Sequence, residues 1–531
     1  MEMFNGDIDE NFNKPKENNS CQSVEENSHN DFKKLFKDFA SDTSSHGIAK
    51  ATLSSGHLRR FVWFLICATC YSFTIYMSSI LINTYMDKPT KTKVDILYEK
   101  KIHFPAVTVC NLNPFRKSRI MNMSALKEIV AHFGDDRYNK TVNSSLKHII
   151  ERQVKAYEKM FADNIEKGRD ISVNKYMILE DLFAMAASKH DEENLKKVGH
   201  QFHNFIMSCR WGIFDCNSGA FKEYWVQTWN WRYGNCFTFN FGINQTGHDM
   251  GIQETRIPGP SNGLTLELNI EQHEYLDALI DEAGAIITIH NAKQLPFPYY
   301  EGITVPPGFS SSLAIRMETM TRVDPFKNGS CNSSPFLAKN NIYRNYLSGS
   351  VKTYSVKACM QSCLANAQLK RCNCSAAKYA IHVKKICKPE EMRCINEVST
   401  MFKYSRLGCS KKCPQPCLQN SFLHTLMTST LTSKAREKRK RKEIGNSTET
   451  EFDFDKDFVR VKIFYNELNH KAVVQSTYYD LASLFGDIGG LMGLCVGVSV
   501  ISIAEFGELL ISLCILGAGK ARKKKRPKTF S

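Results

Sequence analysis

Two acidic side chains lie inside the last apolar stretch of the chain. This stretch, residues 488–519, reads IGGLMGLCVGVSVISIAEFGELLISLCILGAG and contains Glu505 and Glu508. About 20 apolar residues are enough to cross the hydrocarbon of a membrane, so a longer stretch must tilt, break or protrude. A carboxylate at that depth is costly and usually faces protein or a water-filled path. The two acids therefore indicate a path for cations across a membrane, and the alternative is a tilted anchor helix.

A short triplet, Gly497, Val498 and Ser499, precedes these acids. Small residues let helices approach closely, and irregular backbone is tolerated at membrane depth only where it lines a cavity. The triplet is therefore compatible with an irregular segment that lines a pore. It is equally compatible with an anchor helix that packs on its neighbours through small residues. An enzyme is disfavoured because the sequence has no nucleophile elbow, no HExxH and no phosphate loop, and no cofactor is expected.

A second apolar stretch, residues 61–86, has no formal charge and is long enough to span a membrane. Sixty mostly polar residues precede it, so it is not a signal peptide. Basic residues flank spans on the cytoplasmic side, and they occur before the first stretch and after the second: Lys50, Arg59, Arg60, Lys520, Arg522, Lys523, Lys524, Lys525, Arg526 and Lys528. The sequence therefore predicts two spans in the plasma membrane with both termini in the cytoplasm. The expected segments are a cytoplasmic N-terminus 1–57, transmembrane helix 58–86, extracellular domain 87–480, transmembrane helix 481–517 and cytoplasmic tail 518–531.

The net charge of +16 over 531 residues raises the question of a nucleic-acid partner. Much of the basic excess lies in the tail beside the second apolar stretch, where attraction to anionic lipid explains it more simply. We therefore expect contact with membrane lipid and no nucleic-acid partner.

Cysteines are concentrated between the two apolar stretches, which hold fourteen of the 19. An even number in this region predicts disulfides in an oxidising compartment. The same region contains eight Asn-x-Ser/Thr sequons, as expected of a glycosylated exterior: Asn122, Asn139, Asn143, Asn244, Asn328, Asn332, Asn373 and Asn446. Another at Asn18 lies on the predicted inner side.

The spacing of two cysteine groups indicates helices joined by disulfides. Cys359 and Cys363 are four residues apart, as are Cys409, Cys413 and Cys417, and residues four apart share one face of a helix. Two antiparallel helices would then be joined in rungs, with an early cysteine of one paired to a later cysteine of the other. Close cysteines can also bind zinc, but an oxidising compartment favours disulfides, and we expect no metal.

The region between the apolar stretches is expected to be a mixed α+β domain. Alternating or apolar runs predict strands at residues 104–109, 264–270, 285–290 and 459–465. Residues 120–206 are polar with few helix breakers and are expected to be helical, and the first 45 residues are expected to be disordered. The basic run near residues 436–439 (REKR) has the form of a proprotein-convertase site, although a solvated helix face is the usual meaning of such a run.

Several short motifs, spread over nearly the whole chain, carry a resemblance to one family. They are, in order, Ser45-His46-Gly47, FPAVTVCN at 104–111, NCFTFN at 235–240, Cys372-Asn373-Cys374, and GDIGG at 486–490 followed by Gly497-Val498-Ser499. In joint order and spacing the chain resembles the epithelial sodium channel/degenerin family. It looks nearest to acid-sensing members and to cnidarian or molluscan channels gated by FMRFamide- or RFamide-type peptides.

The resemblance implies a homo- or heterotrimeric sodium channel that amiloride-type compounds block. Each subunit would contribute two spanning helices and an ectodomain of palm, knuckle, β-ball, finger and thumb. The second helix would unwind at Gly497, Val498 and Ser499 to form the constriction, where carbonyl groups replace the water of a permeant Na⁺. His46 and Gly47 would support the pore mouth, Glu505 and Glu508 would draw cations to the inner vestibule, and Gly486 beside Asp487 would lie at the gate.

The resemblance also implies seven disulfides and suggests a stimulus. The implied pairs are Cys110–Cys236, Cys209–Cys216, Cys331–Cys417, Cys359–Cys413, Cys363–Cys409, Cys372–Cys394 and Cys374–Cys387. Acid-sensing members use clustered carboxylates between finger and thumb. This chain has Asp277, Asp281 and Glu282 on the finger side, but only Glu397 between Cys394 and Cys409. We therefore expect an extracellular neuropeptide ligand; the alternatives are a proton-gated or constitutively active channel and, more distantly, an ATP-gated receptor or a two-span adhesion scaffold.

Overall fold

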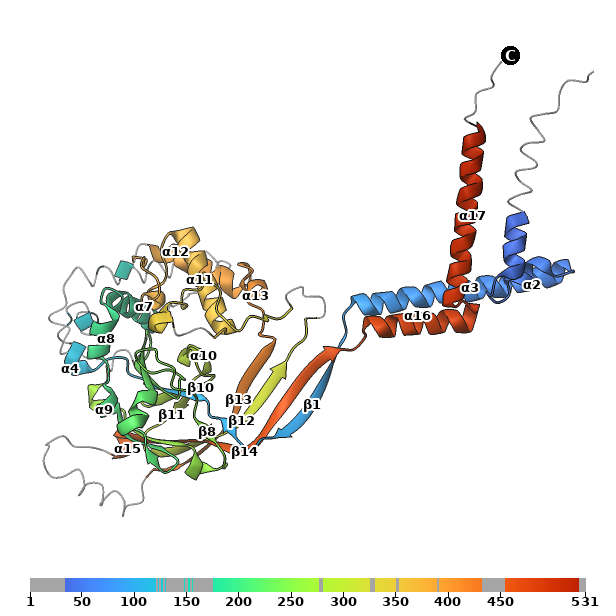
Figure 1. Cartoon of the computed structure of the whole chain (residues 1–531). Coiled ribbons are helices and arrows are strands. Elements are labelled where there is room, and N and C mark those ends of the chain that lie inside the picture. Colours follow the sequence, from blue (N-terminus) through green and yellow to red (C-terminus); the bar gives the residue numbers. More distant parts are fainter. Residues whose placement is uncertain are drawn as a thin grey trace, which may run out of the picture. The chain divides into compact units, whose positions relative to one another are not determined.

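The computed structural model describes residues 34–120, 175–276, 280–324, 330–349, 353–388, 391–431 and 454–524, with a few isolated positions between 120 and 175 (Figure 1). The chain forms two compact units. We call Met1–Lys91 with Thr477–Ser531 the helical unit, and Thr92–Ser476 the cysteine-rich unit. The predicted sequons at Asn122, Asn139, Asn143, Asn328 and Asn446, the acid Asp277 and the basic run at 436–439 lie outside the described residues.

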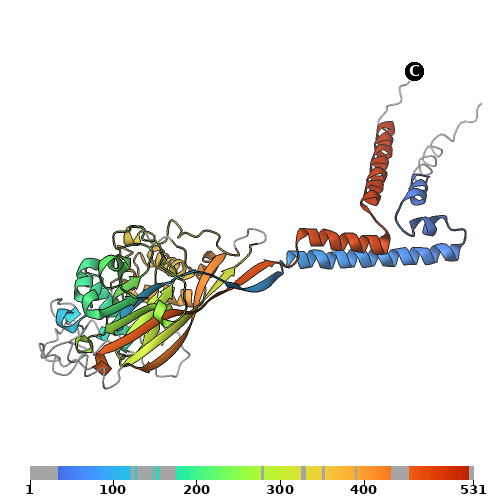
Figure 2. The ribbon, with the colours of Figure 1, turned by 60° about the horizontal axis from the view of Figure 1, so that its bottom comes forward.

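The helical unit contains α2 (Ile48–Leu53), α3 (His57–Met86), α16 (Leu481–Val496) and α17 (Val500–Lys524). Helices α3 and α16 lie side by side in both views (Figures 1 and 2). By length and composition α3 could cross a membrane, and α16 and α17 qualify only when taken together as one bent span. Residues 34–42 are helical, so the prediction of disorder up to residue 45 is wrong for this part. Phe39 of this helix packs against Phe506 of α17, with ring centroids 5.1 Å apart.

The larger sheet of the cysteine-rich unit has seven strands in the order β13-β12-β14-β9-β4-β5, with β1 paired to β14. The long strands β12 and β14 run parallel, whereas β13–β12, β14–β9, β9–β4 and β4–β5 pair antiparallel (Figure 2). The strands are β1 (Thr90–Tyr98), β4 (Ile206–Trp211), β5 (Phe214–Asp215), β9 (Leu264–Asn269), β12 (Phe309–Thr321), β13 (Leu418–Thr430) and β14 (Phe458–Thr477).

A second, five-stranded antiparallel sheet has the order β11-β10-β3-β7-β6. Its strands are β3 (Ala106–Asn111), β6 (Trp225–Asn230), β7 (Gly234–Phe239), β10 (Ala285–His290) and β11 (Ile303–Val305), and a small pair joins β2 (Ile102–His103) to β8 (Glu254–Thr255). All four strands predicted from alternation are therefore confirmed within a residue or two at their starts; β14 continues well past its predicted end.

The main core lies between the two sheets, because apolar side chains of both join a single buried cluster. Val107 and Val109 of β3 contribute from one sheet, and Leu266 of β9 and Val461 and Ile463 of β14 contribute from the other; none of these five is measurably exposed. Burial of such side chains stabilises the fold by about 1.5–3 kcal/mol each relative to exposure. Strand β3 is buried at every position, which explains why apolar residues do not alternate with exposed polar ones along it.

Helices make up much of the rest of the cysteine-rich unit. Helices α7 (Lys175–Ala187), α8 (Glu192–Val198) and α9 (Phe202–Phe205) lie in the part predicted to be helical, and α4 (Lys117–Ile120) ends where that part begins. Later in the chain come α10 (Pro298–Glu301), α11 (Val356–Cys372), α12 (Met392–Lys403), α13 (Cys409–Lys412) and α15 (Phe454–Asp457). Figure 1 shows α11, α12 and α13 gathered together.

Seven disulfides cross-link the cysteine-rich unit, and they join the same seven pairs that the family resemblance implies. Cys110 and Cys236 lie directly opposite each other on β3 and β7. Cys359–Cys413 and Cys363–Cys409 join α11 to α13 and the residue that follows it. The expected pair of rungs is present, but α13 is a single four-residue turn rather than a long helix.

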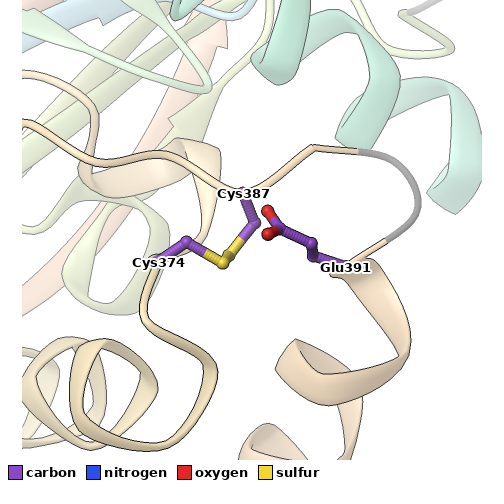
Figure 3. Close-up of side chains that lie close together, drawn as sticks. All are labelled: Cys374, Cys387 and Glu391. Atoms are coloured by element: carbon purple, nitrogen blue, oxygen red, sulfur yellow. A yellow bond between two sulfur atoms is a disulfide. The ribbon is translucent and has the colours of Figure 1, made fainter.

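Cys374, Cys387 and Glu391 form a cluster with metal-ligand geometry, but the two sulfur atoms are bonded to each other (Figure 3). Sulfur in a disulfide does not supply the thiolate that zinc requires. The carboxylate of Glu391 accepts the Lys388 N–H at 2.9 Å, so this acid closes a turn. The cluster gives no support to the zinc alternative.

The rungs between α11 and α13 lead to a testable expectation. Replacing Cys363 by serine should reduce surface delivery of the protein as much as replacing Cys409, because either change removes the same bond, worth about 2–4 kcal/mol. The double replacement should add little. Surface biotinylation measures the delivered fraction, with Cys514→Ser, a free cysteine of the helical unit, as the control. If the two single losses of surface delivery add up in the double variant, Cys363 and Cys409 do not share one disulfide.

Candidate pore and gate

The second apolar helix breaks at the triplet Gly497, Val498 and Ser499, where unwinding is predicted. Helix α16 ends at Val496, and α17 begins at Val500 after a bend of 77°. Gly497 has φ of 67°, in the left-handed region that glycine enters at little cost. Its N–H donates to the carbonyl of Gly493 at 3.2 Å, and the Val498 N–H donates to that of Met492 at 3.3 Å. The carbonyls at the end of α16 are thus partly satisfied as the chain turns.

The restart of the helix has its own local cause. The Ser499 N–H donates to the hydroxyl oxygen of Ser502 at 3.0 Å, and the Ser502 N–H donates to that of Ser499 at 3.3 Å. This reciprocal pattern resembles a capping box, in which two side chains satisfy free N–H groups at a helix start. The sequence Gly-Val-Ser-x-x-Ser therefore both ends one helix and begins the next.

A segment from the N-terminal side, residues 43–47, lies against this break; we call it the strap. The His46 N–H donates to the carbonyl of Val496 at 2.9 Å, and the Ser45 hydroxyl lies 3.2 Å from the same oxygen. A side chain at Gly497 would collide with the His46 imidazole, since an added Cβ would fall 1.3 Å from Nδ1. The glycine at position 497 is therefore required twice, by its backbone angle and by this contact.

The other side of the strap contacts helix α3. Gly47 has φ of 87°, and a Cβ there would lie 2.5 Å from Sγ of Cys67. The Ser45 hydroxyl, 4% exposed, lies 2.8 Å from that of Tyr71. His46 and Gly47 thus lie between α3 and the break in the second apolar helix, with Gly47 close to α3 and His46 against Gly497.

The two acids of α17 have different surroundings. Oε2 of Glu505 accepts the Ser44 N–H at 2.9 Å, the Thr43 hydroxyl at 3.1 Å and the Ser44 hydroxyl at 3.3 Å. Glu508 is exposed, and its carboxylate has no recorded partner among the residues that the structure describes. The two acids, which sequence analysis treated alike, therefore differ in their hydrogen bonds.

The proposed gate position lies one and a half turns into α16. Asp480 caps this helix by accepting the Ser483 N–H at 2.7 Å, and the Tyr479 hydroxyl donates to Oδ2 of Asp487 at 2.7 Å. A Cβ built on Gly486 meets no described atom within 4 Å. Within one chain this glycine has room for a side chain, so any steric role must come from another subunit.

The carboxylates of the cysteine-rich unit that the sequence analysis named have different surroundings. Exposed Asp281 and Glu282 line a cavity of about 260 Å³ together with Glu180 and Arg232. Arg232 pairs with Glu180 at 2.9 Å; burial nevertheless raises the pKa of Glu180 above its ordinary value. Glu397 lies on α12 and pairs with Arg393 of the same helix at 3.6 Å.

Two further acids, Glu271 and Glu274, are buried just after strand β9. Sequence analysis missed both. Nδ1 of His200 lies 2.7 Å from Glu271, and Arg116 lies 3.1 Å from Glu274, which also accepts from Ser118. Burial alone would raise the pKa of each carboxyl, but these hydrogen bonds and charges lower both. No spacing in the sequence indicates this group, because its members come from three separate segments, at residues 116–118, 200 and 271–274.

Sequence analysis also missed the contacts that hold the strap, in particular those of Thr43, Ser44 and Tyr71. The run Thr43-Ser44-Ser45 before His46 was a usable signal, because consecutive hydroxyls next to a glycine often bond to nearby backbone. It does not reveal the partner, which lies more than 450 residues away.

The comparisons with known proteins agree with this geometry. The model of the family described as "Amiloride-sensitive sodium channel" matches residues 39–509. The chain is 25% identical to epithelial sodium channel subunit alpha of Xenopus laevis, with 92% of this chain and 82% of the relative covered. It is 27% identical to acid-sensing ion channel 1C of Danio rerio over 92% and 86% of the two chains, and 24% identical to epithelial sodium channel subunit beta of Bos taurus over 90% and 82%. With a family match over most of its length, the chain belongs to the amiloride-sensitive sodium channel family, as a sodium channel subunit of the plasma membrane and not an enzyme.

Proposed function

We propose that the chain forms a trimeric, amiloride-sensitive sodium channel, alone or with sister subunits, and that an extracellular peptide opens it. Each subunit crosses the membrane twice, through α3 and through α16 with α17, and both termini are cytoplasmic. Residues 87–480 are extracellular and glycosylated. The observation that carries the proposal is the break at Gly497, Val498 and Ser499, because irregular backbone at membrane depth is expected only where it lines a cavity or path.

The constriction is built from the backbone of this triplet. Three copies of Gly497 and Ser499 would bring carbonyl and hydroxyl oxygens around one axis, where they replace part of the hydration shell of Na⁺. The strap supports the break from the cytoplasmic side through His46 and Gly47. The exposed carboxylate of Glu508 is available to attract cations to the inner mouth.

Gating by a peptide is supported by the way acids are paired in the cysteine-rich unit. A proton-driven switch needs carboxylates whose mutual repulsion is relieved by protonation. Glu397 is paired within its own helix, and Glu271 and Glu274 are held ionised by His200, Arg116 and Ser118. The pKa values of Glu271 and Glu274 are lowered from the ordinary value of a glutamate, so mild acid would not neutralise these two carboxylates.

Sequons support an extracellular position for this unit. Asn244 and Asn332 are partly exposed, and Oδ1 of Asn244 accepts both the N–H and the hydroxyl of Thr246 at the third sequon position. Asn373 lies between two disulfide cysteines and before Ser375, which is fully buried. We therefore propose glycans on Asn244 and Asn332 and none on Asn373.

A screen in oocytes tests the stimulus. The chain, expressed alone and with sister subunits, should give sodium current in response to at least one RFamide-type peptide and no comparable current on a step from pH 7.4 to about pH 5. Replacement of extracellular sodium and addition of amiloride should both remove the current. Large acid-evoked currents without any peptide response would contradict peptide gating and leave the channel assignment intact.

Proton gating remains the second candidate, because two of the relatives are named acid-sensing ion channels, 1C and 4-B of Danio rerio. The cavity with Asp281, Glu282 and Glu180 is where such sensing would act, since burial already raises the pKa of Glu180. The same pH step decides between the two candidates.

A further inference from the structure

The carboxylate of Glu505 is occupied by the strap, while that of Glu508, one turn farther along α17, is open. Oε2 of Glu505 accepts three hydrogen bonds, and all three donors belong to Thr43 and Ser44. One of these donors is a backbone N–H, so the contact fixes the path of the strap and not only its side chains. An acid that draws cations needs no such partners.

We propose that Glu505 is a positioning residue, which anchors the N-terminal strap against the break of the pore helix by accepting hydrogen bonds. The strap is then held at two points on either side of the bend. On the α16 side the His46 N–H donates to the carbonyl of Val496, and on the α17 side Ser44 and Thr43 donate to Glu505. With both contacts made, the imidazole of His46 lies directly against Gly497.

Two neighbouring contacts support the anchor. The hydroxyls of Ser44 and Ser502 are within hydrogen-bond distance, and Ser502 is the residue that caps α17 through Ser499. Phe39, four residues before Thr43, packs on Phe506, the residue after Glu505. The anchor therefore links the strap to the same serine pair that starts the helix after the constriction.

The role predicted for Glu505 depends on hydrogen-bond acceptance and not on charge. Glutamine keeps an acceptor oxygen of the same reach but has no charge, whereas alanine has neither. Glutamine should therefore preserve most of the docking through somewhat weaker bonds, whereas alanine leaves the donors of Thr43 and Ser44 without this acceptor and should lose it. Glu508 is the matched control, because it carries the same charge on the same helix.

Thiol labelling measures the docking without requiring any current. Ser45 is buried against Tyr71 and Val496, so the thiol introduced by Ser45→Cys should react slowly with a membrane-permeant maleimide in the full-length chain in cells. Adding Glu505→Ala should raise the labelling rate at least about tenfold, as expected when the shared acceptor of three hydrogen bonds is lost. Adding Glu505→Gln, Glu508→Ala or Glu508→Gln should change it less than about threefold. The chain without Ser45→Cys gives the background from its own free cysteines.

Sodium conductance gives the second readout, and it rests on the proposed function. Glu505→Gln should retain current that Glu505→Ala loses, while Glu508→Gln and Glu508→Ala should reduce conductance equally. If Glu505→Gln and Glu505→Ala reduce conductance equally and neither changes labelling, Glu505 acts through its charge and the proposal is overturned. If no variant or parent conducts, the pore assignment fails, and the labelling series still decides the anchor.

Discussion

A large side chain at position 486, as in Gly486→Val or Gly486→Phe, should produce a constant sodium current that needs no ligand and that amiloride blocks. In the proposed topology the predicted gate position, Gly486, would lie near the outer end of α16, and a trimer would bring three copies together near its axis. Glycine there lets the helices close, whereas valine or phenylalanine should hold them apart. Because a Cβ on Gly486 meets no described atom of its own chain within 4 Å, the substitution should leave the subunit folded and act on its neighbours.

Whole-cell recording in sodium and in a sodium-free solution measures the standing current, and surface biotinylation measures delivery. Gly489→Val is a suitable control, since it adds the same volume one turn farther along and also meets no described atom of its own chain. The alternative is that Gly486 is only a packing glycine, in which case the substitution lowers surface expression. Normal surface levels without a standing current would place the gate elsewhere.

Gly497→Ala should abolish the current or change its ion selectivity while the protein still reaches the surface. The alanine Cβ would need the space of the His46 imidazole, and the left-handed backbone at φ of 67° adds about 1–2 kcal/mol of strain. Ser499→Cys should also alter selectivity, because it enlarges the side chain at the constriction and weakens the cap with Ser502. Reversal potentials in sodium and potassium measure the effect.

A double substitution tests the steric explanation. His46→Ala removes the ring that the Gly497→Ala side chain would strike, so the pair should be less impaired than the sum of the two single losses. Such coupling is expected only for residues in contact. Strictly additive losses would mean that His46 and position 497 act separately, and unaltered ion ratios and conductance in both Gly497→Ala and Ser499→Cys would remove these residues from the pore.

Peptide gating and the role of Glu505 bear on each other through the strap. If a peptide opens the pore, the backbone at residues 497–499 must hold one geometry in the closed channel and change it only when the ligand binds. The hydrogen bonds from the strap to Val496 and Glu505 hold the two sides of the break in place. Weakening the anchor should therefore affect conduction even when the ligand site is intact.

Local features of this protein follow from the sequence alone. Hydropathy and length indicate the two apolar stretches, alternation predicts four of the strands, and the sequence Gly-Val-Ser-x-x-Ser contains both the helix end at Gly497 and the cap at Ser499 and Ser502. These effects depend on interactions within about six residues, so they can be inferred without knowing the fold. Fourteen cysteines in an oxidising region likewise predict disulfides, although their pairing came from the family resemblance.

Only the tertiary structure distinguishes the surroundings of two acids that look alike in the sequence. Glu505 and Glu508 look equivalent in the sequence, yet only Glu505 bonds to the strap, across 461 residues of chain. The single turn of α13, the parallel pairing of β12 with β14, and the burial of Glu271 and Glu274 are equally non-local. Contacts of this kind depend on how separate segments pack, and the free energy of that packing is not encoded in the composition of either segment.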